Sequence, residues 1–124
     1  MPARLQRACS VFLVEDEAMI RMMVADMLEE LGHSVAIEAG SMANALAMAQ
    51  TAQFDLAILD VNLGGQMIFP VADAVAARDR PIIFATGYSA ETIPGNYKSY
   101  QRLQKPFRIE LLENAIHAAL GAGQ

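Results

Sequence analysis

Five side chains that could bind a cation and a phosphoryl group lie at the ends of successive apolar runs. Glu15 and Asp16 follow the first of these runs, Asp60 ends a later one, and Thr86 and Lys105 come at the ends of two more. Carboxylates that share a crevice raise one another's pKa unless a cation lies among them. Mg²⁺ suits two carboxylates, a backbone carbonyl and water molecules. A lysine charge and a threonine hydroxyl are groups that can hold phosphoryl oxygens during transfer.

Asp60 is the residue of this set that could accept the phosphoryl group. The strand that it ends is expected to be central, so Asp60 would lie between the other candidates. A carboxylate can form an acyl phosphate, and water hydrolyses that bond, so the modification would be reversible.

A purely structural interpretation exists for each feature taken alone. An acidic pair such as Glu15 and Asp16 is often only a favourable charge at a helix N-terminus. A lone Lys-Pro pair such as Lys105 and Pro106 is a still weaker signal. We favour the functional interpretation because four such features follow one another at successive strand ends, in the order that a shared crevice requires.

The apolar pattern predicts the elements that would carry these residues. Short β-branched runs predict strands at residues 10–15, 34–37, 54–60, 81–86 and 100–104. Helical spacing predicts helices at residues 17–31, 68–77 and 107–120, and Ser41 can cap another that runs through residues 44–50. Residues 88–100 include Pro94 and Gly95 and lack a clean apolar period, so any helix there is short or loosely formed.

This alternation predicts an α/β fold, a doubly wound sheet of five parallel strands with helices on both faces. In such sheets ligands bind beyond the carboxyl ends of the strands. The chain has 124 residues, 54% of them hydrophobic and 19% charged, which indicates one packed domain over residues 8–121 with short tails. The five candidate side chains should therefore meet in one crevice.

The composition also argues against several classes of function. The net charge of −5 at pH 7 disfavours binding to a nucleic-acid backbone, which needs clustered Lys and Arg. No apolar stretch approaches the roughly 20 residues that span a bilayer, so we expect a cytoplasmic protein with no membrane partner. Cys9 lacks a second cysteine, and His33 and His117 lack metal-ligand spacing, so we expect structural or solvated roles for all three.

Four short motifs resemble those of the receiver domain of two-component response regulators, over nearly the whole chain. They are LVEDE at residues 13–17, ILDVNL at 58–63, FATGY at 84–88 and QKPF at 104–107. The resemblance implies the flavodoxin-like receiver fold and a bound Mg²⁺. Asp16 would bind this ion directly, Glu15 mainly through water, and Asn62 through its backbone carbonyl, with Asp60 in the same metal site.

The same resemblance implies roles in phosphoryl transfer. Asp60 would be the phosphoacceptor, and Thr86 and Lys105 would contact the phosphoryl oxygens. The peptide bond between Lys105 and Pro106 is expected to be cis, as it commonly is in this family. Phosphorylation and dephosphorylation would be self-catalysed, so the protein would not be a turnover enzyme on external substrates.

One position departs from the family pattern. Receivers usually have an aromatic switch residue three positions before the active-site lysine, and here that residue is Arg102. The motif at residues 84–88 resembles the FAT GUY group of single-domain receivers, which also lack that aromatic. In that group an aromatic after the threonine is thought to replace it, which makes Tyr88 the candidate here. Ordinary packing explains Tyr88 equally well.

The resemblance also implies protein partners. Met19, Met22 and Met23 in the first predicted helix, with Pro106 and Phe107, are the candidates for docking a sensor histidine kinase or a histidine phosphotransfer protein. Core packing is an alternative role for Met23. The FAT GUY resemblance points to kinases of the HWE kind. The output would pass through contacts with an unidentified downstream protein, or the chain would act as a phosphate sink. Formation of a homodimer is a further possibility that the sequence does not decide.

Two rival functions are less well supported. A phosphatase of the haloacid-dehalogenase type also uses a strand-end aspartate and Mg²⁺, but it needs a second aspartate two positions later, where this chain has Asn62. A degenerate receiver would bind partners without being phosphorylated, and the complete set of acidic, threonine and lysine residues argues against it.

Overall fold

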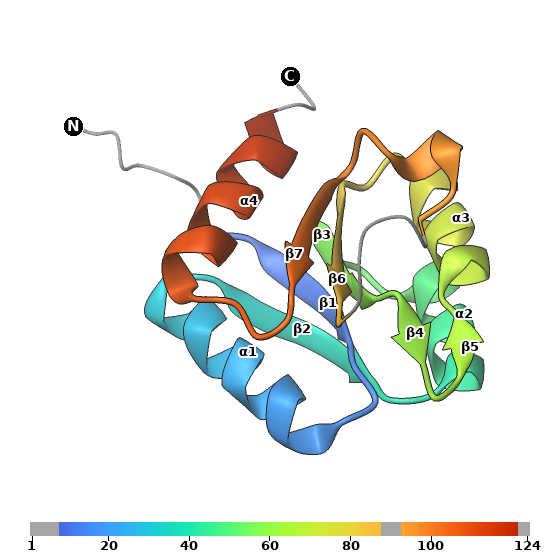
Figure 1. Ribbon diagram of the computed structural model, residues 1–124, viewed down its shortest axis with the longest axis horizontal. Helices are drawn as coiled ribbons and strands as arrows, with labels where there is room; N and C mark the ends of the chain where they lie inside the picture. The colour runs from blue at the N-terminus through green and yellow to red at the C-terminus, as the bar shows by residue number, and fades with distance from the viewer. Residues whose placement is uncertain (1–7, 88–92, 122–124) are drawn as a thin grey trace.

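The computed structural model describes residues 8–87 and 93–121. Five strands form one sheet in the order β2-β1-β3-β6-β7, and each neighbouring pair is parallel (Figure 1). The strands are Ser10–Val14 (β1), Ser34–Ala39 (β2), Leu56–Asp60 (β3), Ile82–Thr86 (β6) and Gln101–Gln104 (β7). The predicted five-stranded parallel sheet is confirmed, and its central strand, β3, ends at Asp60.

Four helices cover the two faces of this sheet. The pair α1 (Ala18–Glu30) and α4 (Ile109–Gly121) packs on one face, and α2 (Met42–Thr51) and α3 (Phe69–Ala77) pack on the other (Figure 1). Consecutive residues of β1 divide between the faces, because Phe12 belongs to the α2 and α3 side and Leu13 to the α1 and α4 side. The doubly wound arrangement is confirmed.

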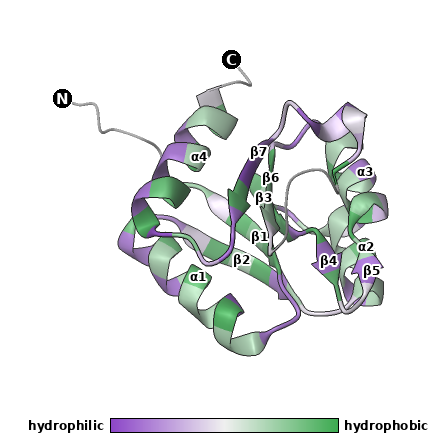
Figure 2. Ribbon diagram, in the orientation of Figure 1, coloured by the Kyte–Doolittle hydropathy of each residue, from purple (hydrophilic) through white to green (hydrophobic). Residues whose placement is uncertain are grey.

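Burial on both faces explains the apolar character of the strands. Every residue of β3 and β6 is buried, which is why each reads as a continuous apolar run and not as an alternating one. Figure 2 shows hydrophobic residues along the sheet and on the helices that cover it. None of the helices in the described ranges has the length and apolar character of a membrane span.

Two predicted helix boundaries are also confirmed. Ser41 Oγ accepts a hydrogen bond of 3.3 Å from the Asn44 backbone N–H and so caps the start of α2. Gly32 follows the end of α1 with a φ of 92°, a left-handed conformation that glycine adopts without steric cost. This turn allows β2 to begin two residues later.

The structure adds a hairpin that the sequence pattern does not predict. After β3, the short strands β4 (Asn62–Leu63) and β5 (Gln66–Met67) pair antiparallel around Gly64 and Gly65. Both glycines have positive φ, 59° and 90°, as the two central residues of a type I′ turn require. This glycine pair therefore forms a tight turn close after Asp60.

The stretch after β6 agrees with the weak helical pattern of its sequence. Its described part holds one 3₁₀ turn, η2 (Gly95–Tyr97), before β7 begins. Tyr97 in this turn is buried against Phe84 of β6 and Phe69 of α3, with ring centroids 5.4 and 5.7 Å away. Tyr100 contacts Tyr97 and Phe84 as well, so an aromatic cluster holds this segment against the sheet.

Cys9 and His33 form a buried pair where β1 and β2 begin. The Cys9 backbone N–H donates to His33 Nδ1 at 3.1 Å, and Cys9 Sγ lies 3.4 Å from the same nitrogen. Nδ1 accepts a hydrogen bond in the neutral imidazole but not in the protonated one. Burial and the nearby His117 lower the pKa of His33, whereas Glu113 raises it.

We expect acidification to destabilise the protein through His33. Its pKa is lowered in the folded state, so the unfolded chain binds the proton more tightly, and the stabilising contribution declines as the pH falls below about 6.5. His33→Asn keeps a side-chain acceptor for the Cys9 N–H but does not titrate. Asp60 titrates in both proteins, so urea unfolding between about pH 5 and pH 7.5 should show that the unfolding free energy of the wild type, relative to this variant, increases with pH. Equal slopes in the two proteins would contradict the assignment.

Candidate functional site

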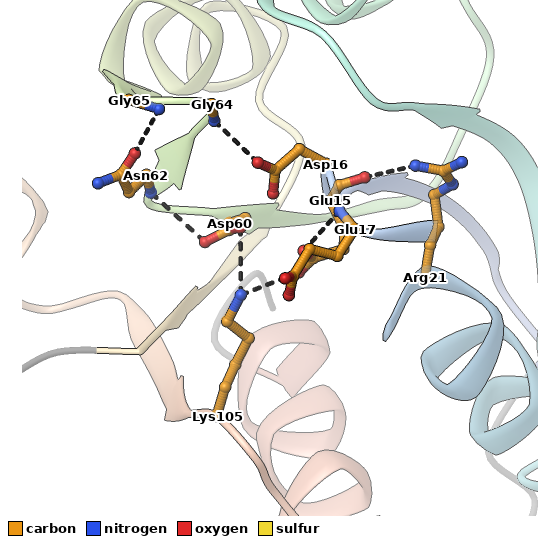
Figure 3. A network of polar contacts seen from close by, with 9 residues as sticks. All are labelled: Glu15, Asp16, Glu17, Arg21, Asp60, Asn62, Gly64, Gly65 and Lys105. Atoms are coloured by element: carbon orange, nitrogen blue, oxygen red, sulfur yellow. Dashed lines mark hydrogen bonds and ion pairs between the residues drawn. The ribbon is translucent and has the colours of Figure 1, made fainter. Parts of the chain in front are cut away.

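The parallel sheet brings the predicted site residues to one edge (Figure 3). Glu15 and Asp16 lie directly after β1, Asp60 is the last residue of β3, and Thr86 is the last residue of β6. Lys105 follows β7, and its backbone N–H donates to the Thr86 carbonyl at 2.8 Å. Thr86, Glu15 and Asp60 are buried. These five residues thus lie together at the carboxyl ends of the strands.

Lys105 connects two of the carboxylates. Its Nζ lies 3.1 Å from Glu15 Oε1 and 3.2 Å from Asp60 Oδ2. One oxygen from each of Glu15, Asp16 and Asp60 lies within 4.8 Å of the others. The group combines three acidic side chains with one ammonium, which is the charge pattern that the sequence predicts.

The β4–β5 hairpin closes over the acidic cluster. The Gly64 N–H donates to Asp16 Oδ2 at 3.0 Å, and the Asn62 N–H donates to Asp60 Oδ1 at 3.4 Å. The Asn62 side chain accepts from the Gly65 N–H at 2.9 Å and so stabilises the turn. The side-chain oxygen of Asn62 is thereby engaged in the turn, which is compatible with the predicted use of its backbone carbonyl as a ligand.

Burial and like charge shift the pKa of Asp60. Burial and the Glu15 carboxylate raise this pKa from 3.8 to about 6, although Lys105 and the Asn62 N–H act in the opposite direction. Burial lowers the pKa of Lys105, but its contacts with Glu15 and Asp60 outweigh burial and the net shift is upward. Lys105 is therefore cationic at neutral pH, whereas Asp60 gains its full charge only above about pH 6.

The donor set fits a hard divalent cation. All the candidate ligand atoms are oxygens, and their carboxylates come from two neighbouring strands. Asp16 is exposed, whereas Glu15 and Asp60 are buried, so the cluster has one side open to water. Mg²⁺ usually keeps several of its water ligands in protein sites, and an opening of this kind accommodates them.

Of the two predicted switch residues, the structure describes Arg102 but not Tyr88. Arg102 lies in β7, and its Nη2 donates to the Lys98 carbonyl at 2.7 Å, so its side chain is bound to the segment before the strand. Tyr88 lies outside the described residues. The peptide bond between Lys105 and Pro106 is cis, as predicted.

The methionines of α1 are partly exposed, and Met23 and Met27 border an apolar cavity that Lys105 also lines. Met19, Met22 and Met23 are exposed, with 77%, 65% and 51% of their surface accessible. A cavity of about 190 Å³ lies between α1 and the loop after β7, and its lining consists of Ile20, Met23, Val24, Met27, Lys105, Pro106 and Phe107. Met23 therefore borders the cavity, and its surface is largely accessible.

Sequence patterns missed two contacts that hold the acidic loop. The Glu17 N–H donates to Glu15 Oε2 at 3.1 Å, and Arg21 Nη1 donates to the Glu15 backbone carbonyl at 2.6 Å. Figure 3 shows both contacts, and Arg21 Nε also pairs with Glu38 Oε1 at 3.0 Å. Neither contact has a sequence signal, because the partners share no periodic pattern.

Removal of the Asp60 charge should stabilise the cation-free protein at neutral pH. The proton favours the folded state, because the folded pKa of about 6 exceeds the ordinary 3.8, and this contribution is lost as the pH rises through about 6. We expect Asp60→Asn to raise the unfolding free energy by about 1–3 kcal/mol near pH 7.5 with a chelator present, and by less near pH 5. Denaturant titrations of both proteins measure this difference. A destabilised variant near pH 7.5 would contradict the pKa assignment.

A family model and two curated relatives match the chain. The model of the response regulator receiver domain matches residues 11–117. The transcriptional regulatory protein PdtaR of Mycobacterium tuberculosis strain H37Rv is 34% identical over 114 residues, which are 89% of this chain and 56% of PdtaR. YvrH of Bacillus subtilis, also a transcriptional regulatory protein, is 31% identical over 83 residues, 66% of this chain and 35% of YvrH. The chain thus spans about half, or less, of these relatives.

Solved structures of similar fold include one of nearly the same length. SdrG from Sphingomonas melonis Fr1 is 41% identical and superposes with a TM-score of 0.81, covering 91% of this chain and 97% of that one. The response regulator PhyR from Brucella abortus is 27% identical with a TM-score of 0.81, and the match covers 94% of this chain and 49% of PhyR. Since the family model spans most of the sequence, this chain belongs to the response regulator receiver domain family of two-component systems.

Proposed function

We propose that this chain accepts a phosphoryl group on Asp60 in a Mg²⁺-dependent reaction. The observation that carries the proposal is the contact of Lys105 Nζ with both Glu15 and Asp60 at the edge of the crevice. A lysine in this position can exchange its carboxylate contact for the oxygens of an incoming phosphoryl group. Its charge would then counter the charge of the acyl phosphate.

In the proposed reaction, an Asp60 carboxylate oxygen attacks the phosphorus of a phosphohistidine. The new O–P bond forms as the N–P bond breaks, and the ring leaves with the electron pair of that bond and takes a proton from water to become neutral imidazole. Lys105 and the Thr86 hydroxyl then bind phosphoryl oxygens. Asp16, Asp60, the Asn62 carbonyl and, through water, Glu15 would hold Mg²⁺, which supplies positive charge to counter that of the phosphoryl oxygens.

Loss of the phosphoryl group would occur by hydrolysis and would not make the chain a turnover enzyme. A haloacid-dehalogenase mechanism needs a general acid at position 62. Asn62 has no acidic proton, and its side-chain oxygen accepts the Gly65 N–H. This contact supports the receiver reaction over the phosphatase reaction.

The proposed phosphodonor is a sensor histidine kinase or a histidine phosphotransfer protein, of the HWE kind if the FAT GUY grouping applies. Met19, Met22 and Met23, with the adjacent Pro106 and Phe107, form the proposed docking surface for it. The support is that Met23, Pro106 and Phe107 line one cavity with Lys105, and that Met19 and Met22 are exposed on the same helix, where methionines make adaptable contacts. Tyr88 stays the candidate for the switch aromatic, because Arg102 cannot supply one.

The proposed output is either a contact with a downstream protein or the action of this chain as a phosphate sink. One relative is described as the anti-anti-sigma factor PhyR from Bartonella quintana, 27% identical, and this chain covers 50% of it. By analogy, we propose that a downstream protein recognises the phosphorylated form of this chain. Self-association into a homodimer is part of the same proposal.

Phosphorylation should depend on Asp60 and on Mg²⁺. We expect incubation with Mg²⁺ and a small phosphodonor such as acetyl phosphate to add the mass of one phosphoryl group to the wild type. Asp60→Asn should gain nothing, and a chelator should abolish the gain in the wild type. Intact mass spectrometry measures the three samples. A mass gain that survives the substitution, or no gain in the wild type, would overturn the proposed function.

Docking through α1 should be separable from the chemistry at Asp60. We expect Met19→Glu with Met22→Glu to slow phosphotransfer from phosphorylated histidine kinases of the same genome by about tenfold or more, because the apolar contacts are lost. Phosphorylation by acetyl phosphate should keep its wild-type rate. Leu111→Glu on α4 is the matched control, since Leu111 is also an exposed apolar side chain. Equal slowing by the control would remove the specific role of α1.

A further inference from the structure

Arg21 contacts the loop that carries the acidic residues without belonging to the acidic cluster (Figure 3). Its Nη1 donates to the Glu15 backbone carbonyl at 2.6 Å, and its Nε pairs with Glu38 Oε1 at 3.0 Å. The Arg21 backbone N–H donates to the Glu17 carbonyl at 2.9 Å. One residue of α1 therefore bonds to both ends of the connection from β1, before and after Asp16.

The hydrogen bond to the Glu15 carbonyl restricts the backbone of this connection. Glu15 continues the sheet through its N–H, which donates to the Ala39 carbonyl at 3.1 Å, but its own carbonyl turns to Arg21. That carbonyl belongs to the peptide unit that joins Glu15 to Asp16. A fixed peptide plane restricts ψ of Glu15 and φ of Asp16, the backbone torsions on either side of that plane. This hydrogen bond thus holds the backbone from which both carboxylates project, in addition to the direct contacts that each carboxylate makes.

Gly40 provides the space for the Arg21 guanidinium. A Cβ on residue 40 would lie 2.9 Å from Arg21 Nη1 and 3.7 Å from the Glu15 carbonyl oxygen. Gly40 is not among the residues with positive φ, so its backbone conformation does not by itself require glycine. Residue 40 therefore has to lack a side chain because Arg21 comes so close, and not because of its own backbone conformation.

We propose that Arg21 is a positioning residue that orients Glu15 and Asp16 for cation binding, and that Gly40 makes this position of its guanidinium accessible. The inference rests on the proposed function, since it takes Mg²⁺ as the ion that the carboxylates bind. Charge alone predicts the opposite effect, because a guanidinium repels a nearby cation and its removal would tighten binding. Positioning predicts weaker binding, so the direction of the change separates the two explanations.

Titration calorimetry of Mg²⁺ into the full chain tests the inference. We expect Arg21→Met, which keeps an apolar stem without donors, to raise the Kd about three- to tenfold, and Gly40→Ala to have a similar effect by displacing the guanidinium. The double variant should bind no more weakly than Arg21→Met, because alanine at position 40 clashes with Arg21 and makes only an ordinary contact with the Glu15 carbonyl. Glu38→Gln, which leaves the carbonyl contact in place, should stay within about twofold.

Amide exchange in the metal-free protein gives a second readout. We expect the amides of Asp16 and Glu17 to exchange faster in Arg21→Met and Gly40→Ala but not in Glu38→Gln, with the amides of β3 unchanged in all three. Unchanged or tighter Mg²⁺ binding in Arg21→Met, or an additive loss in the double variant, would overturn the inference. Absence of Mg²⁺ binding in the wild type would instead overturn the proposed function, and exchange would still decide whether Arg21 orders the loop.

Discussion

The crevice depends on one lysine that holds two buried carboxylates together. Glu15 and Asp60 are each 3% exposed, and burial and the Glu15 carboxylate raise the pKa of Asp60. Lys105 Nζ contacts both, although it lies 90 and 45 residues away from them in the chain. It reaches them only when β7 has paired with β6, since the Lys105 N–H bonds to the Thr86 carbonyl. The ammonium of Lys105 can therefore offset the two carboxylate charges only after the sheet has formed, and no short segment of the chain contains all three groups.

The strand ends could be predicted because a buried parallel strand stays apolar until it leaves the sheet. In β3 and β6 the first polar side chains after the apolar run are Asp60 and Thr86, the residues that face the crevice. The doubly wound topology then places successive strand ends side by side, so the grouping of the site follows from the order of elements. The chemical roles of these residues stay predictions, because proximity alone does not establish a reaction.

Other contacts could not be predicted, because they depend on side-chain positions across the fold. The bond from Arg21 to the Glu15 carbonyl spans six residues, which matches neither the helical nor the strand period. The Cys9 and His33 pair joins segments 24 residues apart. The β4–β5 hairpin did have a local signal, since two adjacent glycines favour a two-residue turn, but its strands of two residues are too short to show alternation.

Position 102 has no aromatic side chain, but the aromatic side chain of Tyr97 packs on the same side of the sheet. Arg102 Nη2 bonds to the Lys98 carbonyl, while Tyr97 packs on Phe84 and its hydroxyl donates to the Asp73 carboxylate of α3. Burial and this carboxylate raise the pKa of Tyr97, so its hydroxyl keeps its proton and the bond persists across the neutral pH range. The described part of the segment between β6 and β7, residues 93–100, is thus joined to α3, β6 and β7. Displacement of the 3₁₀ turn η2 has to break the Tyr97 contacts with α3 and β6, so the position of this turn depends on the packing of both elements.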